Sequence, residues 1–391
     1  MASVQTLNSS LNAKAKAEVE GCNGLSPHHV SSITPWCLFA GRDAMKRIAV
    51  DLAKSVYQVA ESVQVGRVDR RKRLDAGAFA RYVQEQIEPV EWVMEACGTA
   101  HHWGRLMQEK GHRVVLLHPR YVRPYRRRNK TDRNDCDAIL EAARCQDIRP
   151  VPVKSVQQQQ VQQLHKLREG WKKSRVQRIN LLRGILRESG VEAPNGIKPF
   201  LRQACELIER PEVRALRGAL QVVLAEINLY EQSMRECEEQ LARWHADDEI
   251  VRKLDEVSGI GLLTASAFKT AVGKPERFAS GRHLSAWLGM TPNEYSSGER
   301  RRLGRISCKG NVYVRTLLIH GARAALLAAK RCKARTPERL TQLQSWALQT
   351  AERIGHNKAA VALANKLVRI CWAVWCHERR FSGNWHSTKP A

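Results

Sequence analysis

The chain has 391 residues, of which 43% are hydrophobic, and its 65 Lys and Arg outnumber 39 Asp and Glu to give a formal net charge of +26. The apolar fraction suffices for packed cores and excludes wholesale disorder, and no apolar run approaches the ~20 residues that a membrane span needs. A charge this positive favours nucleic acid as the partner, ahead of an anionic membrane surface. The 11 Cys lack close pairing, which predicts free thiols in a reducing compartment.

Composition divides the chain into five segments. Residues 1–45 have little apolar periodicity and are predicted to be a disordered N-terminal extension. Residues 46–150 mix short apolar strands with helices, which is typical of an α/β sheet domain. Residues 151–246 are predicted to form a helical coiled-coil region, residues 247–380 a helical C-terminal domain, and residues 381–391 a tail.

Residues 46–150 have a clear order of predicted elements. Apolar runs predict strands at 48–52, 56–63, 92–95 and 114–118. Helical spacing predicts helices at 75–87, 103–110 and 135–144.

Residues 151–246 and 247–380 are predicted to be helical, apart from a Gly/Ser/Arg-rich loop at about 291–311. A heptad pattern of ten apolar residues predicts a long helix: Val213, Leu216, Leu220, Val223, Ile227, Tyr230, Met234, Cys237, Leu241 and Trp244. This helix either packs on the preceding helix at 160–187 or forms a dimerisation arm, and both can hold at once. Long helices follow at about 312–331 and 356–378.

Four acids are candidate metal ligands. Asp51 lies inside one apolar strand and Glu95 ends another, where an unpartnered carboxylate is costly to bury. Asp132 and Asp135 are spaced so that they point the same way at a helix start. Together they predict an oxygen-rich site for one or two Mg²⁺ (or Mn²⁺) ions. The alternative is that each acid is a surface residue or a helix cap.

Two basic segments predict contacts with nucleic-acid phosphates. The first holds seven cations in fourteen positions: Arg120, Arg123, Arg126, Arg127, Arg128, Lys130 and Arg133. The second is a helical stripe: Lys166, Arg168, Lys172, Lys173, Arg175, Arg178, Arg183 and Arg187.

Two glycine-containing segments in the C-terminal part also point to phosphate chemistry. The turn around Gly259 and Gly261 is typical of a helix-hairpin-helix, in which the backbone approaches a phosphate, although it could be a plain turn between helices. The loop beginning YSSGERRR places Ser297 before Gly298 and three arginines, Arg300, Arg301 and Arg302. An exposed serine among arginines could be a nucleophile on DNA, or the segment could simply be a basic loop.

These segments together resemble a known family. In order and spacing, IAVDLAK, VMEACGTAHHWGR, NKTDRNDCDA, VSGIGLLTASA, GRHLSAWLGMTP, YSSGERRRLGRIS and RTLLIHGARA are similar to the DEDD transposases of the insertion-sequence-110 family, subgroup 1111, which are related to the Piv invertases. The resemblance implies a RuvC-like (RNase H fold) N-terminal domain, a coiled-coil middle and a C-terminal domain with a helix-hairpin-helix element and a serine nucleophile. It matches Asp51, Glu95, Asp132 and Asp135 to the metal-binding acids and Ser297 to the serine. Asp137 is a spare acid, interpreted as a surface or supporting residue.

The function implied is that of a Mg²⁺-dependent DNA transposase and recombinase. The resemblance also implies an element-encoded guide RNA, a homo-oligomer, no membrane partner and a cytoplasmic, nucleoid-associated location. Two alternatives remain: a junction nuclease that uses the four acids and water while Ser297 is idle, and a nucleic-acid-binding protein without catalysis.

Overall fold

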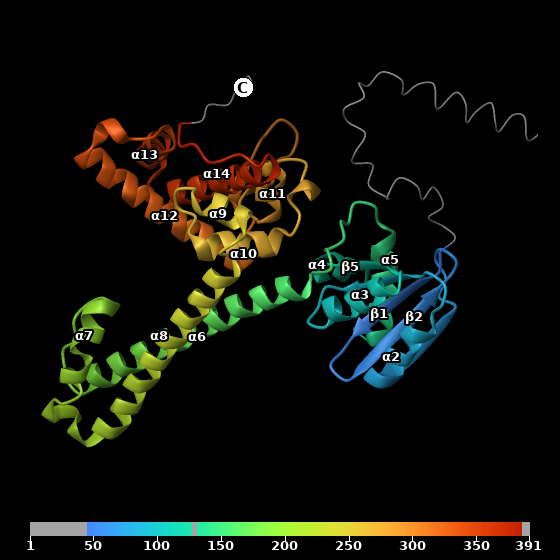
Figure 1. The fold of residues 1–391 in the computed structure, drawn as a ribbon, viewed down its shortest axis with the longest axis horizontal. Helices are drawn as coiled ribbons and strands as arrows, with labels where there is room; N and C mark the ends of the chain where they lie inside the picture. The colour runs from blue at the N-terminus through green and yellow to red at the C-terminus, as the bar shows by residue number, and fades with distance from the viewer. Residues whose placement is uncertain (1–44, 127–130, 385–391) are drawn as a thin grey trace, which may run out of the picture. The chain divides into compact units, whose positions relative to one another are not determined.

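The computed structural model describes residues 45–126 and 131–384, so all but the last residue of the predicted extension at 1–45 and most of the predicted tail lie outside the described residues. The chain divides into two compact units, one ending at Val153 and the other beginning at Lys154. Each unit is described by itself below, with elements labelled as in Figure 1.

The first unit contains a five-stranded sheet in the order β3-β2-β1-β4-β5. The strands β1, β2 and β3 form an antiparallel meander, while β4 and β5 run parallel to β1. The strands are β1 (Arg47–Leu52), β2 (Val56–Ser62), β3 (Arg70–Asp75), β4 (Glu91–Glu95) and β5 (Arg113–Leu117). The helices are α2 (Ala76–Glu85), α3 (Ala100–Glu109), α4 (Pro119–Val122), η2 (Arg123–Tyr125) and α5 (Asp132–Arg144).

Helices cover both faces of this sheet. On one face, α2 and α3 bury Phe79 and Trp103 against Ile48, Val50 and their neighbours. On the other face, α5 packs the apolar residues of its buried side against Ala49, Ala60 and Val93. The central strand β1 is therefore buried on both faces, which explains its continuous apolar run. The α/β sheet expected from the sequence is confirmed, and its arrangement fits a RuvC-like domain.

The edge strand β3 is the element of this sheet that the sequence did not predict. Its residues, RRKRLD, contain four consecutive cations and no apolar alternation. Pairing with β2 along its whole length makes it a strand. Charged side chains are common on edge strands because they discourage pairing with another chain.

The second unit begins with two long helices that lie side by side in one chain (Figure 1). They are α6 (Val156–Glu188) and α8 (Arg217–Trp244), joined through α7 (Ile197–Leu207) and the 3₁₀ turn η3 (Pro211–Leu216). Leu220 and Ile227 of the heptad are buried with Ile179 and Leu182 of α6, whereas Leu216 is exposed. Ion pairs Arg168–Glu238 and Arg175–Glu231, both 2.6 Å, fix an antiparallel register. We call these two helices the α6–α8 hairpin.

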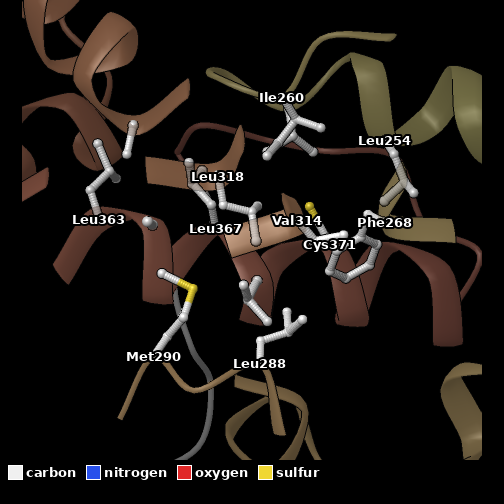
Figure 2. Close-up of a cluster of buried hydrophobic side chains, with 14 of the residues drawn as sticks. Leu254, Ile260, Phe268, Leu288, Met290, Val314, Leu318, Leu363, Leu367 and Cys371 are labelled. Carbon is white, nitrogen blue, oxygen red and sulfur yellow. The ribbon is translucent and has the colours of Figure 1, made fainter. Parts of the chain in front are cut away.

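The remaining helices form a bundle with one apolar core (Figure 2). They are α9 (Glu249–Asp255), α10 (Leu262–Val272), η4 (Pro275–Arg277), α11 (Gly281–Trp287), α12 (Val312–Arg335), η5 (Pro337–Arg339), α13 (Gln342–Ile354) and α14 (His356–Cys376), with a small β-hairpin of β6 (Pro292–Glu294) and β7 (Leu303–Ile306). Leu363, Leu367 and Cys371 of α14 belong to this core (Figure 2). By length and composition alone, α12 and α14 could each cross a membrane. Their apolar faces instead pack against the other helices of the bundle.

A buried chain of polar side chains joins the α6–α8 hairpin to the bundle. Its bonds are His165 Nδ1 to Tyr313 Oη, 3.1 Å; His165 Nε2 to Ser266 Oγ, 3.0 Å; Ser266 Oγ to His245 Nε2, 2.9 Å; and His245 Nδ1 to Asp248 Oδ2, 3.3 Å. Lys269 pairs with the same Asp248 carboxylate. With both imidazoles neutral, every donor along the chain meets an acceptor: Tyr313 donates to His165, His165 to Ser266, Ser266 to His245, and His245 to Asp248.

This polar chain predicts acid-sensitive stability. Burial chiefly, with the charges of Arg168 and His245, lowers the pKa of His165 to about 4, whereas an unfolded histidine titrates near 6.5. Between pH 6.5 and pH 4, His165 therefore binds a proton in the unfolded state but not in the folded state. The stabilisation is complete above pH 6.5 and is lost as pH falls, by about 3 kcal/mol at pH 4. Urea unfolding followed by helical circular dichroism measures it. The difference between wild type and His165→Gln should shrink between pH 7 and pH 4, and a constant difference would contradict the assignment.

Candidate active site

Two of the four predicted acids lie at the carboxyl ends of neighbouring parallel strands, Asp51 next to last in β1 and Glu95 last in β4. Asp51 and Glu95 each lie one residue beyond the paired positions Val50 and Met94 of β1 and β4, so they are at the same level of the sheet. Side chains alternate along a strand. Asp51 therefore shares the face of Ala49, and Glu95 that of Val93, which is the face covered by α5. Both acids are half-buried, and neighbouring strands are about 4.8 Å apart, which places the two carboxylates within reach of one cation.

The other two acids lie in the first turn of α5. Thr131 is the N-cap of this helix, since its hydroxyl accepts from the Asn134 amide at 3.3 Å, so neither aspartate has the capping role left open by the sequence. Asp132 is exposed and Asp135 is buried. The Arg126 guanidinium pairs with the Asp135 carboxylate. The favourable dipole at a helix N-terminus stabilises both negative charges.

The position of α5 on the sheet brings its first turns close to Asp51. The Cys136 thiol, next to Asp135, donates to the Gln58 carbonyl at 3.1 Å, and Gln58 is the cross-strand partner of Asp51. Burial chiefly, with the charges of Asp51 and Asp137, raises the pKa of the Cys136 thiol. This thiol therefore stays protonated at neutral pH and acts as a packing group. Asp137 pairs with Arg71 at 2.7 Å, in keeping with a surface or supporting role.

The donor set at this face is suited to a hard divalent cation. Asp51, Glu95, Asp132 and Asp135 offer only carboxylate oxygens, the ligands that Mg²⁺ and Mn²⁺ prefer. Within residues 45–126 and 131–384, no three acidic, His or Cys side chains are already gathered into a metal cluster. The four residues therefore fit the ion by the type of their donor atoms, and Arg126 pairs with Asp135 in the arrangement described.

Ser297 lies at the tip of the hairpin formed by β6 and β7. Its backbone exchanges two hydrogen bonds with Arg300, 3.3 and 3.2 Å, which closes a turn of Gly298 and Glu299. Gly298 has φ +55°, as the first central position of such a tight turn requires. Ser297 is exposed, and no described residue hydrogen-bonds its hydroxyl. The segment is therefore a hydrogen-bonded β-hairpin rather than the loop predicted from its composition.

The neighbouring serine has a structural role. Ser296 Oγ donates to Glu294 at 2.8 Å and accepts from the Arg302 amide at 3.2 Å, while Arg301 pairs with Glu294 at 3.2 Å. These contacts stabilise the hairpin just below its tip. Ser297 and the three predicted arginines Arg300, Arg301 and Arg302 are exposed around it.

The base of the hairpin is anchored by contacts that the sequence did not reveal. The buried Arg315 of α12 donates to the carbonyls of Leu288, 3.0 Å, and Lys309, 3.2 Å. Gly289 and Gly310 have positive φ, and a Cβ on Gly289 would lie 1.9 Å from the Lys309 carbonyl oxygen. Only glycine fits such a backbone contact. The only hint in the sequence that Arg315 has a role is its position at the start of RTLLIHGARA, one of the segments that carry the family resemblance.

The Gly259–Gly261 turn is also held from within. It connects α9 to α10, as a helix-hairpin-helix requires. However, Gly259, with φ +90°, lies against Gly321 of α12, where an added Cβ would meet the Gly259 carbonyl at 1.8 Å. The close packing against Gly321 therefore explains why position 259 is a glycine, without any phosphate contact. Gly261 is exposed at the N-cap of α10, so it can be approached by a phosphate.

The predicted basic segments carry fewer available charges than their sequences suggest. On α6, Arg168, Arg175 and Arg178 pair with glutamates of α8, and Arg183 donates to loop carbonyls. Lys172 pairs with Glu169 at 3.3 Å, and Lys173 is exposed. Of the first segment, Arg126 is engaged by Asp135, and Arg127, Arg128 and Lys130 lie outside the described residues.

A second serine has the contacts of a catalytic triad without access to substrate. Ser266 lies 2.9 Å from His245, which in turn contacts Asp248. Its side chain is 0% exposed and its hydroxyl is bracketed by two imidazoles. It cannot reach a phosphodiester, so Ser297 is the better candidate for a nucleophile.

Comparison with known proteins identifies the group to which these features belong. A family model described as "Transposase IS116/IS110/IS902 family" matches residues 251–337, and a DEDD model of the IS110 group, described as "Transposase", matches residues 53–190. The two matches include Glu95, Asp132 and Asp135 and the segment with the glycine turn and Ser297, whereas Asp51 lies two residues before the first matched segment.

Relatives of similar length extend the likeness over most of the chain. A probable family 20 transposase of Pseudomonas aeruginosa is 37% identical over 338 residues, which are 85% of this chain and 98% of the relative. The transposase for insertion sequence element IS1111A of Coxiella burnetii is 35% identical over 86% of this chain and 91% of its own. The transposase for IS1328 of Yersinia enterocolitica is 31% identical over 86% and 98%.

Proposed function

The chain belongs to the IS116/IS110/IS902 family of transposases, enzymes that cut and rejoin DNA, and we propose that it does so through Ser297 assisted by the four acids. The observation that carries the serine assignment is the exposed Ser297 hydroxyl at the tip of an anchored hairpin, with three arginines beside it. Its neighbour Ser296 is used for structure, and Ser266 is buried.

In the proposed reaction, Ser297 Oγ attacks the phosphorus of a DNA phosphodiester. The Oγ–P bond forms, the P–O bond to one sugar breaks, and the hydroxyl proton is balanced by protonation of the departing sugar oxygen. The product is a phosphoserine link to one DNA end. Because the phosphodiester is exchanged rather than hydrolysed, the reverse attack by a new sugar hydroxyl rejoins DNA without an energy source.

The acids and arginines have separate parts in this proposal. Asp51 and Glu95, with Asp132 and Asp135, would hold the Mg²⁺ or Mn²⁺ on which DEDD transposases generally depend, and the bound ion supplies positive charge against the charge that develops on the phosphate oxygens. Arg300, Arg301 and Arg302 orient the phosphate at the hairpin tip through charge-assisted hydrogen bonds. Arg126 orients the Asp135 carboxylate through their ion pair.

The partners follow from the charge and from the family. Transposases bind DNA, and we propose that its backbone is contacted by the Lys173 ammonium, by the backbone at Gly261 and by other exposed cations of the helical unit. An element-encoded guide RNA would neutralise part of the +26 charge and would select the target by base pairing. We propose that oligomers form on nucleic acid in the cytoplasm, next to the nucleoid.

A covalent trap tests the proposal. The protein is incubated with Mg²⁺ and DNA carrying the ends of its element, and then denatured in detergent. We expect a protein–DNA adduct that resists denaturation, and mass spectrometry of its nuclease-treated peptides should find the phosphoester on Ser297. DNA cleavage without any adduct would favour the water-using nuclease, and absence of both cleavage and adduct would favour a binding protein without catalysis.

A further inference from the structure

The edge strand β3 carries charge that the proposed function has not used. Its residues Arg70–Arg73 are four consecutive cations. Alternation along the strand sorts them onto the two faces of the sheet. Cross-strand pairing of Arg71 with Ala60 and of Arg73 with Gln58 places these two on the face covered by α5, and Arg70 and Lys72 on the opposite face.

Two of these cations are already neutralised. Arg71 pairs with Asp137 of α5 at 2.7 Å. Lys72 lies 3.9 Å from the buried Glu61 and 4.2 Å from the centre of the Tyr82 ring. Arg70 and Arg73 are exposed, and neither makes an ion pair with any residue in the described part of the chain.

Arg73 differs from Arg70 in its position relative to the acids. Arg73 is paired with Gln58, and Gln58 with Asp51, so the three form one row across β3, β2 and β1 on the same face. Glu95 continues the row on β4, one residue beyond the last paired position. Two strand spacings separate Arg73 from Asp51, about 10 Å, which is the rise of about three nucleotides in one strand of B-form DNA.

We call Asp51 and Glu95, which are neighbours across β1 and β4, the acid row. We infer that Arg73 binds the phosphodiester backbone of the DNA strand that lies along the acid row, within about three nucleotides of the scissile phosphate. This inference rests on the proposed function, because it takes the acid row as the place of cutting. Arg73 is a positioning residue: it holds the strand in register with Asp51 and Glu95 and takes no part in bond making. A guanidinium suits this role because it grips phosphate oxygens in a planar, bidentate geometry.

The test compares Arg73→Gln with Arg70→Gln, which removes another exposed cation from the other face of the same strand. Both changes are made in full-length protein carrying Ser297→Ala, so that binding is measured without chemistry. The probe is fluorescent duplex DNA of the element end, titrated at several salt concentrations. We expect Arg73→Gln to weaken binding roughly tenfold at low salt and to reduce the slope of log K against log salt by about 0.9. Arg70→Gln should leave both nearly unchanged, and Arg73→Lys should restore the slope.

A second readout locates the contact on the DNA. Single phosphates near the cleavage site are replaced by neutral methylphosphonates. One such replacement should weaken binding of the Arg73 protein and have no further effect on Arg73→Gln, because both changes remove the same contact. Equal effects of Arg73→Gln and Arg70→Gln, or a loss seen only with RNA probes, would overturn the inference. Failure of the proposed function is seen separately, as a missing covalent adduct with the wild-type protein.

Discussion

Ser297→Ala is expected to abolish strand exchange, with a loss of at least about 10⁴-fold, because the hydroxyl is the only group of this side chain that can form a phosphoester. Ser297 makes no side-chain hydrogen bond to a described residue, so folding and DNA affinity should stay near those of wild type. The measurement is recombination of DNA carrying the element ends, followed on gels, together with trapping of the adduct by denaturation.

Ser296→Ala is the matched control for this variant. It removes a hydroxyl from the adjacent position, where the side chain supports the hairpin through Glu294 and the Arg302 amide. We expect a reduced rate from a looser hairpin, with the adduct still formed. If Ser297→Ala instead recombines DNA at the wild-type rate, the nucleophile has been misassigned and the water-attacking nuclease replaces it.

Asp51→Asn should abolish the reaction by a different route, with a loss of at least about 10³-fold. The change keeps the size of the side chain and removes one of two neighbouring negative charges, so divalent-ion binding at the acid row should weaken. Calorimetric titration with Mn²⁺ measures this directly. Ser297→Ala should bind the ion as wild type does, which separates loss of metal from loss of nucleophile.

Asp137→Asn serves as the control for Asp51→Asn. Asp137 belongs to the same helix as two of the proposed ligands and is also an aspartate, but its carboxylate pairs with Arg71. We expect this variant to retain ion binding and most activity. Equal losses of ion binding in Asp51→Asn and Asp137→Asn would mean that general charge, rather than the acid row, attracts the ion.

The sequence predicted where the strands of the first unit lie along the chain better than it predicted which strands pair with one another. Apolar runs are local signals, and they located β1, β2, β4 and β5 within a few residues. The strand β3 has no such signal, because its strand conformation comes from pairing with β2. The alignment of Asp51 with Glu95 likewise depends on the parallel register of β1 and β4, which joins positions 44 residues apart and is not encoded in either run alone.

In the second unit, the sequence identified the segments that matter but not the structural role of every residue in them. The glycine turn was predicted from its likeness to a phosphate-binding hairpin, and Gly259 proves to be held against Gly321. RTLLIHGARA supplied part of the resemblance without a role, and it contributes both Gly321 and the Arg315 that anchors the serine hairpin. Such contacts join segments that are distant in the sequence, so they can be found only in the folded chain. The composition of either segment alone does not show what it packs against.

The α6–α8 hairpin has a consequence for how the protein is made. Its apolar seam and its arginine–glutamate ladder are completed within one chain. Closing this seam is therefore a first-order event, whose equilibrium does not depend on protein concentration, whereas a seam shared between two chains would come apart on dilution. A cell holding only a few copies of the chain would still contain fully folded α6–α8 hairpins.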